Sequence, residues 1–256
     1  MSGTALVTLQ ILLVAAIVTG LWTMRARYGR GLLLVFLGAT QYVQMSWASM
    51  IYVELLGGFT ASPGSIVLFA GSLFAVLLVY LTTDVPQTRA LIYGVFLANL
   101  AIIALTWTLY VPGVRTWIPG DASLPVPLDI WAFFTGSVLL AADSLLVIVA
   151  YESLARLKVP LAARLILALV VVLAVDSVLW LTISAWGDPA FGARLGGNLV
   201  GKIFSGVLYG SLLTVVILRE RRRDPRAAQP DDSRDVFSIL QYRSRLARAE
   251  SRRREI

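Results

Sequence analysis

Seven apolar runs of about 20 residues constrain the fold of this chain more than any other feature. A helix needs about 20 apolar residues to cross the roughly 30 Å hydrocarbon core of a bilayer. The composition agrees, because 58% of the residues are hydrophobic, only 14% are charged and the mean hydropathy is +0.79. We therefore predict an all-α, polytopic membrane helix bundle with seven transmembrane helices. The predicted spans are 4–24, 31–53, 65–82, 90–110, 128–151, 161–186 and 198–218.

Lysine and arginine fall very unequally on the two sides of these spans. If the N terminus lies outside, Arg115 and Arg194 are the external cations, and twelve cations lie on the opposite side. Positive residues collect on the cytoplasmic side of membrane proteins, so we predict an external N terminus and a cytoplasmic C terminus. No cation precedes the first span, which is therefore expected to be a retained helix and not a cleaved signal peptide. The twelve are Arg25, Arg27, Arg30, Arg89, Arg156, Lys158, Arg164, Arg219, Arg221, Arg222, Arg223 and Arg226.

Two segments outside the spans, 111–127 and 220–256, differ from the spans in composition. The external connection 111–127 contains four prolines and is expected to be a plain loop, with a re-entrant or interfacial lid as the alternative. The chain divides into a transmembrane bundle, 1–219, and a cytoplasmic basic linker with a signalling-type helix, 220–256. That helix has two interpretations: a homodimeric signalling coil, or a basic helix attracted to anionic lipid. Its apolar positions have four-three spacing: Ile239, Tyr242, Leu246, Ala249 and Ile256.

The missing residue types exclude several functions. The chain has no cysteine and no histidine, which removes disulfides, thiol nucleophiles and the usual ligands of zinc. No nucleotide-binding, zinc-protease or kinase motif is present. We therefore expect neither an enzyme nor a cofactor or metal site. The net charge of +7 lies beside the spans and in the tail, so membrane lipids are the expected partner and nucleic acid is not.

A few polar side chains lie inside the predicted spans, where each needs a partner, a water-filled cavity or a function. Counted from the external helix ends at 1.5 Å per residue, four of them lie about 15 to 20 Å deep, and the single membrane lysine about 6 Å. We predict an outward-facing ligand pocket lined by these groups and by tryptophans at or above their depth. The alternative is a structural network, with an Asp176–Lys202 ion pair and interhelical glutamine hydrogen bonds. The predicted ligand-binding residues are Gln41, Gln44, Trp47, Asn99, Trp107, Asp176, Trp180 and Lys202. Asp143 is expected nearer the cytoplasmic side.

Four short motifs carry a family resemblance: Leu81-Thr-Thr-Asp-Val-Pro-Gln-Thr-Arg89, Ile92-Tyr-Gly94, Asp176-Ser-Val-Leu-Trp180, and Gly201-Lys-Ile-Phe-Ser205 leading into Tyr209. They resemble the vitamin-uptake family of queuosine-precursor transporters. They resemble more closely the vitamin-uptake-like sensor domains that precede diguanylate-cyclase modules. The resemblance covers roughly 65–220 and implies a compact six-helix unit, to which the first span is an addition. It also implies a small vitamin-like or heterocyclic ligand near the outer face, with Asp176 and Lys202 in or beside the site.

The tail segment 234–243 resembles the linker that joins the last membrane helix of such sensors to a signalling helix. A cytoplasmic output domain beyond Ile256 is therefore expected. We predict an integral, multi-pass plasma-membrane sensor that binds a small ligand and relays the signal to its tail. The alternatives are a transporter, or substrate-binding transporter subunit, for a vitamin-like or nucleobase-like solute, and a structural protein whose polar layer only holds helices together.

Overall fold

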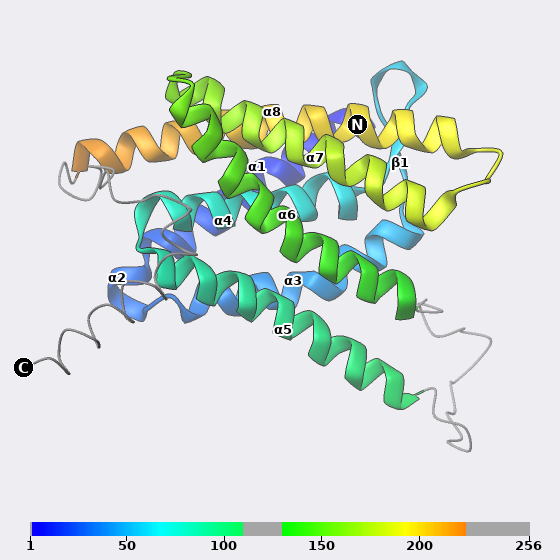
Figure 1. Ribbon diagram of the computed structural model, residues 1–256, viewed down its shortest axis with the longest axis horizontal. Coiled ribbons are helices and arrows are strands. Elements are labelled where there is room, and N and C mark those ends of the chain that lie inside the picture. The colour runs from blue at the N-terminus through cyan, green and yellow to red at the C-terminus, as the bar shows by residue number, and fades with distance from the viewer. Residues whose placement is uncertain (1, 110–129, 224–256) are drawn as a thin grey trace, which may run out of the picture.

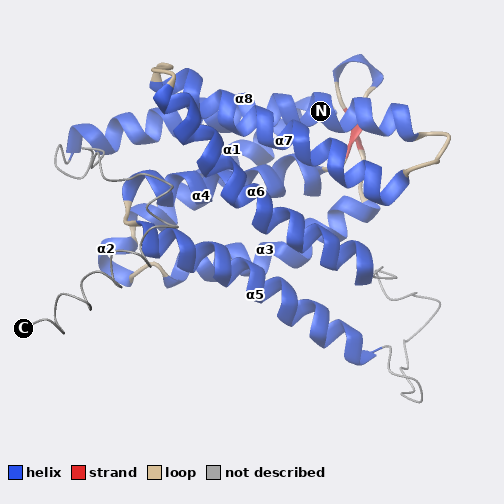
Figure 2. Ribbon diagram, viewed as in Figure 1, coloured by secondary structure: helices blue, strands red, loops and turns tan. Residues whose placement is uncertain are grey.

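The computed structural model describes residues 2–109 and 130–223, and these are almost entirely helical (Figures 1 and 2). The all-α helical bundle predicted from the sequence is confirmed. The helices are α1 (Gly3–Thr23), α2 (Arg25–Tyr28), α3 (Gly31–Met50), η1 (Leu56–Gly58), the π-helical η2 (Gly64–Phe69), α4 (Ala70–Thr82), α5 (Val85–Leu109), α6 (Ile130–Arg156), α7 (Leu161–Ala185) and α8 (Phe191–Arg223). The connection 111–127, predicted to be external, and residues 224–256 of the predicted cytoplasmic segment lie outside the described residues.

The continuous segment η2–α4 forms the centre of the bundle. Its candidate span, Gly64–Thr82, is 89% buried inside the protein, whereas α1 and α5 have spans that are only 22% buried. The other long helices surround it and turn their apolar outer faces outward, as helices in contact with lipid do (Figure 1). A helix that is apolar on every side is expected to occupy such a central position.

Among the described residues, six helices are long and apolar enough to cross a membrane. The seventh long helix, α3, is not one of them, although it has 20 residues. It carries Gln41 and Gln44 in its second half, and both side chains are buried inside the bundle. The count of seven spans and the orientation of the chain in the membrane therefore stay predictions.

Several helices extend beyond the predicted spans because the chain has no residue that stops them there. Helix α8 begins at Phe191 and ends at Arg223, whereas the prediction was 198–218. Its start follows Asp188, whose carboxylate accepts a hydrogen bond from the Ala190 N–H at 2.8 Å. Helix α5 begins at Val85, five residues before the predicted start, and Pro86 is tolerated because it lies in the first turn.

Helix α3 ends at Met50, and a short hairpin replaces the predicted end of the second span. Strands β1 (Val53–Glu54) and β2 (Thr60–Ala61) pair antiparallel and are the only strands in the described part of the chain (Figure 2). Gly57 and Gly58 close the turn at φ of 83° and 78°, a region that side chains disfavour. The hairpin returns the chain to the start of η2, at the end of the bundle predicted to be external.

Helices α7 and α8 run antiparallel and approach closely. A Cβ atom added at Gly206 would lie 3.2 Å from the Val170 backbone, and one added at Gly210 would lie 2.7 Å from the Ile166 Cα atom. Small residues at such positions let helix backbones come together in a membrane. Both glycines therefore serve packing within the bundle.

Candidate functional site

A cavity of about 360 Å³ lies at the end of the bundle where α3 ends and α8 begins. Five helical elements and strand β2 contribute to its wall: α3, η2, α6, α7 and α8. Its volume is within the range of about 300–1,000 Å³ that is typical of small-molecule sites. The cavity therefore lies at the end of the bundle that is predicted to be external, where the sequence predicts a ligand pocket.

The inner end of the cavity is formed by an ion pair between Lys202 of α8 and Asp176 of α7. Only 2% of Lys202 and 4% of Asp176 is exposed. The Lys202 ammonium also lies 4.9 Å from the centre of the Phe69 ring, which provides a cation–π contact from η2. A charge in this environment is costly without its partner, so each side chain of the pair holds the other in the wall.

Asp143 of α6 joins this pair and was not predicted as part of the site. It is 2% exposed, and its carboxyl group lies beside that of Asp176 with Lys202 also nearby. Within the described residues, its Oδ2 atom has no hydrogen-bond partner. Counting its depth from the external helix end, as for the other polar residues, gives roughly 22 Å. The same count gives about 15 Å for Asp176, so depth alone does not bring the two carboxyl groups together.

One face of α8 presents three hydrogen-bond donors to the cavity. Arg194, Asn198 and Lys202 are spaced four residues apart, so they lie above one another on the helix and span about 12 Å. Arg194 forms an ion pair with Asp188 at 3.0 Å, and 53% of its side chain is exposed. Asn198 Oδ1 accepts a hydrogen bond from Ser65 Oγ at 3.3 Å. This bond uses the amide oxygen of Asn198 and does not involve its two N–H groups. The donors thus run from the mouth of the cavity to its inner end.

The rest of the wall combines aromatic rings, small and aliphatic residues, several hydroxyl groups and one buried amide. Phe69, Phe133 and Trp180 line the cavity from η2, α6 and α7. Gln44 of α3 also lines it, is 5% exposed, and its Oε1 atom has no hydrogen-bond partner in the described part of the chain. A buried acceptor without a partner is costly, and a donor on a bound molecule would remove that cost. The arrangement suits a flat molecule with polar atoms along its edge.

Four of the eight predicted site residues line this cavity: Gln44, Asp176, Trp180 and Lys202. Gln41 and Asn99 meet elsewhere, because Asn99 Nδ2 donates to Gln41 Oε1 at 3.4 Å and Gln41 Nε2 donates to the Leu37 carbonyl at 3.1 Å. They form an interhelical network between α3 and α5, and Gln41 lies three residues, about 4.5 Å along the helix, deeper than Gln44.

Two of the predicted tryptophans lie away from the cavity. Trp47 packs against the hydrophobic core, and its carbonyl accepts a hydrogen bond from Ser62 Oγ at 2.6 Å. Trp107 is 57% exposed on α5. Four residues that line the cavity were not predicted: Phe69, Phe133 and the mouth residues Arg194 and Asn198. The last two share the helix face of Lys202 at four-residue spacing, which the sequence does reveal.

Within residues 2–109 and 130–223, no group of three or more Asp or Glu side chains is placed to hold a metal ion. A family model described as "Vitamin uptake-like sensor" matches residues 15–217. The match extends from the middle of α1 nearly to the end of α8, and it includes every residue that lines the cavity. No curated protein and no solved structure matches the chain.

Proposed function

The chain belongs to the vitamin uptake-like sensor family, and from this premise we propose that its cavity binds a small ligand whose occupancy is relayed to the cytoplasmic tail. One observation carries the proposal: the cavity and the tail share helix α8. Lys202 lines the cavity, and the same helix continues without a break to Arg223, where the tail begins. A ligand that contacts α8 differently in two arrangements of the bundle would shift the equilibrium between them.

The wall supports a ligand that is flat, heterocyclic and rich in hydrogen-bond acceptors along one edge. Arg194, Asn198 and Lys202 offer donors along about 12 Å of α8. Trp180 and Phe133 provide aromatic faces against which a ring can stack. Gln44 Oε1 accepts a donor on the opposite edge. A volume of about 360 Å³ suits a molecule of vitamin size.

The protein then acts by binding alone, without a chemical step or a resident cofactor. It is a multi-pass protein of the plasma membrane, where lipids surround it. The tail transmits the change in the position of α8 to a cytoplasmic output domain or to a second copy of the chain. The alternative function, a transporter or transporter subunit, uses the same cavity and requires that it open to the other side of the membrane.

Native mass spectrometry of the protein extracted directly from membranes tests the proposal without knowledge of the ligand. We expect a one-to-one small-molecule adduct on the wild-type protein. Lys202→Met is expected to lose it, and Lys158→Gln, which changes the other lysine of the chain on the predicted cytoplasmic side, is expected to keep it. An adduct kept by Lys202→Met, or no adduct on the wild-type protein, would count against the proposal. Uptake of the extracted ligand into proteoliposomes would favour the transporter.

A further inference from the structure

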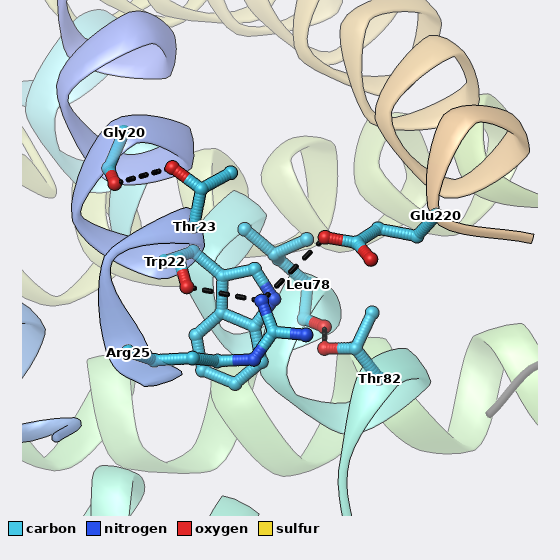
Figure 3. Close-up of polar contacts among 7 residues, drawn as sticks. All are labelled: Gly20, Trp22, Thr23, Arg25, Leu78, Thr82 and Glu220. Carbon is cyan, nitrogen blue, oxygen red and sulfur yellow. Dashed lines mark hydrogen bonds and ion pairs between the residues drawn. The ribbon is translucent and has the colours of Figure 1, made fainter. Parts of the chain in front are cut away.

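The end of the bundle opposite the cavity holds a second contact between helices, at the junction of α1 and α2 (Figure 3). Arg25, the first residue of α2, forms an ion pair with Glu220 near the end of α8, at 3.5 Å from Nη1 to Oε1. The same Nη1 donates a hydrogen bond to the Trp22 carbonyl at 3.0 Å. The guanidinium carbon lies 4.3 Å from the centre of the Trp22 ring. Arg25 therefore joins α1 to α8 through one guanidinium group.

The two sides of this contact differ in how firmly they are held. Trp22 is 1% exposed and belongs to the hydrophobic core, so it provides a fixed base for Arg25. Glu220 belongs to the last turns of α8, next to the start of the cytoplasmic tail. Movement of this end of α8 relative to α1 must therefore lengthen or break the contact between Arg25 and Glu220.

Helix α8 connects this contact to the cavity. Lys202 and Glu220 are 18 residues apart on one helix, a distance of about 27 Å. No proline interrupts the segment between them, so no proline kink separates the two ends. A displacement of α8 at the cavity therefore also moves Glu220, because both belong to the same continuous helix.

We propose that Arg25 and Glu220 form a latch that holds the cytoplasmic end of α8 against α1, and that ligand in the cavity changes how often the latch is open. This inference rests on the proposed sensor function and names its regulatory contact. The Arg25 and Glu220 side chains are 27% and 24% exposed, and a partly exposed pair of this kind is weak enough to open and close. The buried Lys202–Asp176 pair is unsuited to that role, because separating it would leave charges in an apolar interior.

Cysteine labelling tests the latch on ligand-free protein, since the chain contains no cysteine of its own. Spin labels at Ser153→Cys on α6 and Arg222→Cys on α8 report the distance between the bundle and the end of α8. We expect Arg25→Gln and Glu220→Gln each to shift this distance by about 2 Å, the size of a typical helix shift. The charge exchange Arg25→Glu/Glu220→Arg is expected to bring the distance part of the way back to the wild-type value, because the ion pair re-forms although a glutamate at position 25 cannot donate to the Trp22 carbonyl or stack on its ring. The control Arg27→Gln removes the neighbouring exposed arginine and is expected to change nothing.

A second readout at the cavity separates a latch from a structural contact. Ser184 lines the cavity, so the rate at which Ser184→Cys reacts with a water-soluble thiol reagent reports access to it. We expect Arg25→Gln and Glu220→Gln to change this rate roughly two- to fivefold, the factor that a partly exposed ion pair provides. Unchanged rates, unchanged distances, or an exchange variant that resembles the single variants would overturn the latch. Since no ligand is needed, the absence of a membrane-extracted adduct on the wild-type protein would refute the proposed binding function without affecting this result.

Discussion

The buried Lys202–Asp176 pair makes the sharpest prediction about stability. The two side chains are 2% and 6% exposed, and removing one partner leaves the other as an uncompensated charge. Such a loss costs about 3–5 kcal/mol, whereas replacing both partners by apolar groups of similar size is often close to neutral. We therefore expect Lys202→Met and Asp176→Leu each to destabilise the bundle, and the double variant to recover most of the loss. Recovery stays incomplete because Asp143 remains beside the site.

Thermal unfolding in detergent, followed by tryptophan fluorescence, measures these effects. At about 2–4 °C per kcal/mol for a chain of this size, each single variant should lower the melting temperature by about 6–20 °C. Ser184→Ala is the matched control, because its hydroxyl donates only to the Trp180 carbonyl of its own helix and should change stability by less than about 0.5 kcal/mol. Single variants that match this control, or a double variant whose loss equals the sum of the two single losses, would refute the coupling argued here.

Further predictions concern packing and the cavity wall. Gly210→Leu is expected to cost about 1–3 kcal/mol in thermal unfolding because a side chain there meets the Ile166 backbone, while Gly20→Leu, with open space around it, should have little effect. Trp180→Ala should weaken binding of the membrane-extracted ligand roughly tenfold in a thermal-shift titration, since an aromatic wall is lost. Asn99→Leu should cost about 0.6 kcal/mol of stability and leave the adduct in native mass spectra unchanged.

The sequence was sufficient to predict the helical bundle, and the pairing of Asp176 with Lys202 was the structural alternative that it left open beside a ligand pocket. Apolar runs of membrane-spanning length admit few other structures, and two opposite charges on consecutive spans have few other partners. Gln44 and Trp180, which were chosen by their depth, both line the cavity. Depth counted along a helix is robust because the rise per residue hardly varies.

Depth alone does not say which way a side chain points, and this is why the predicted polar layer divides into two sites. Gln41 and Gln44 differ by less than one turn, yet Gln41 faces α5 while Gln44 faces the cavity. The hairpin of β1 and β2 was missed because its four strand residues are too few to show a period. The Arg25–Glu220 contact joins residues 195 positions apart, and no local pattern reports such a distance.

The two glutamines of α3 also bear on how the protein enters the membrane. A helix is inserted according to its apolar character, and α3 falls outside the set of helices that meet this condition unaided. Its Gln41 side chain finds its amide partner on α5, which is synthesised later. Helix α3 is therefore expected to insert stably only together with α5, so that Asn99→Leu lowers the yield of inserted protein more than it lowers the stability of the protein that has inserted. A glycosylation tag placed before α3 would report this difference as a mixture of topologies.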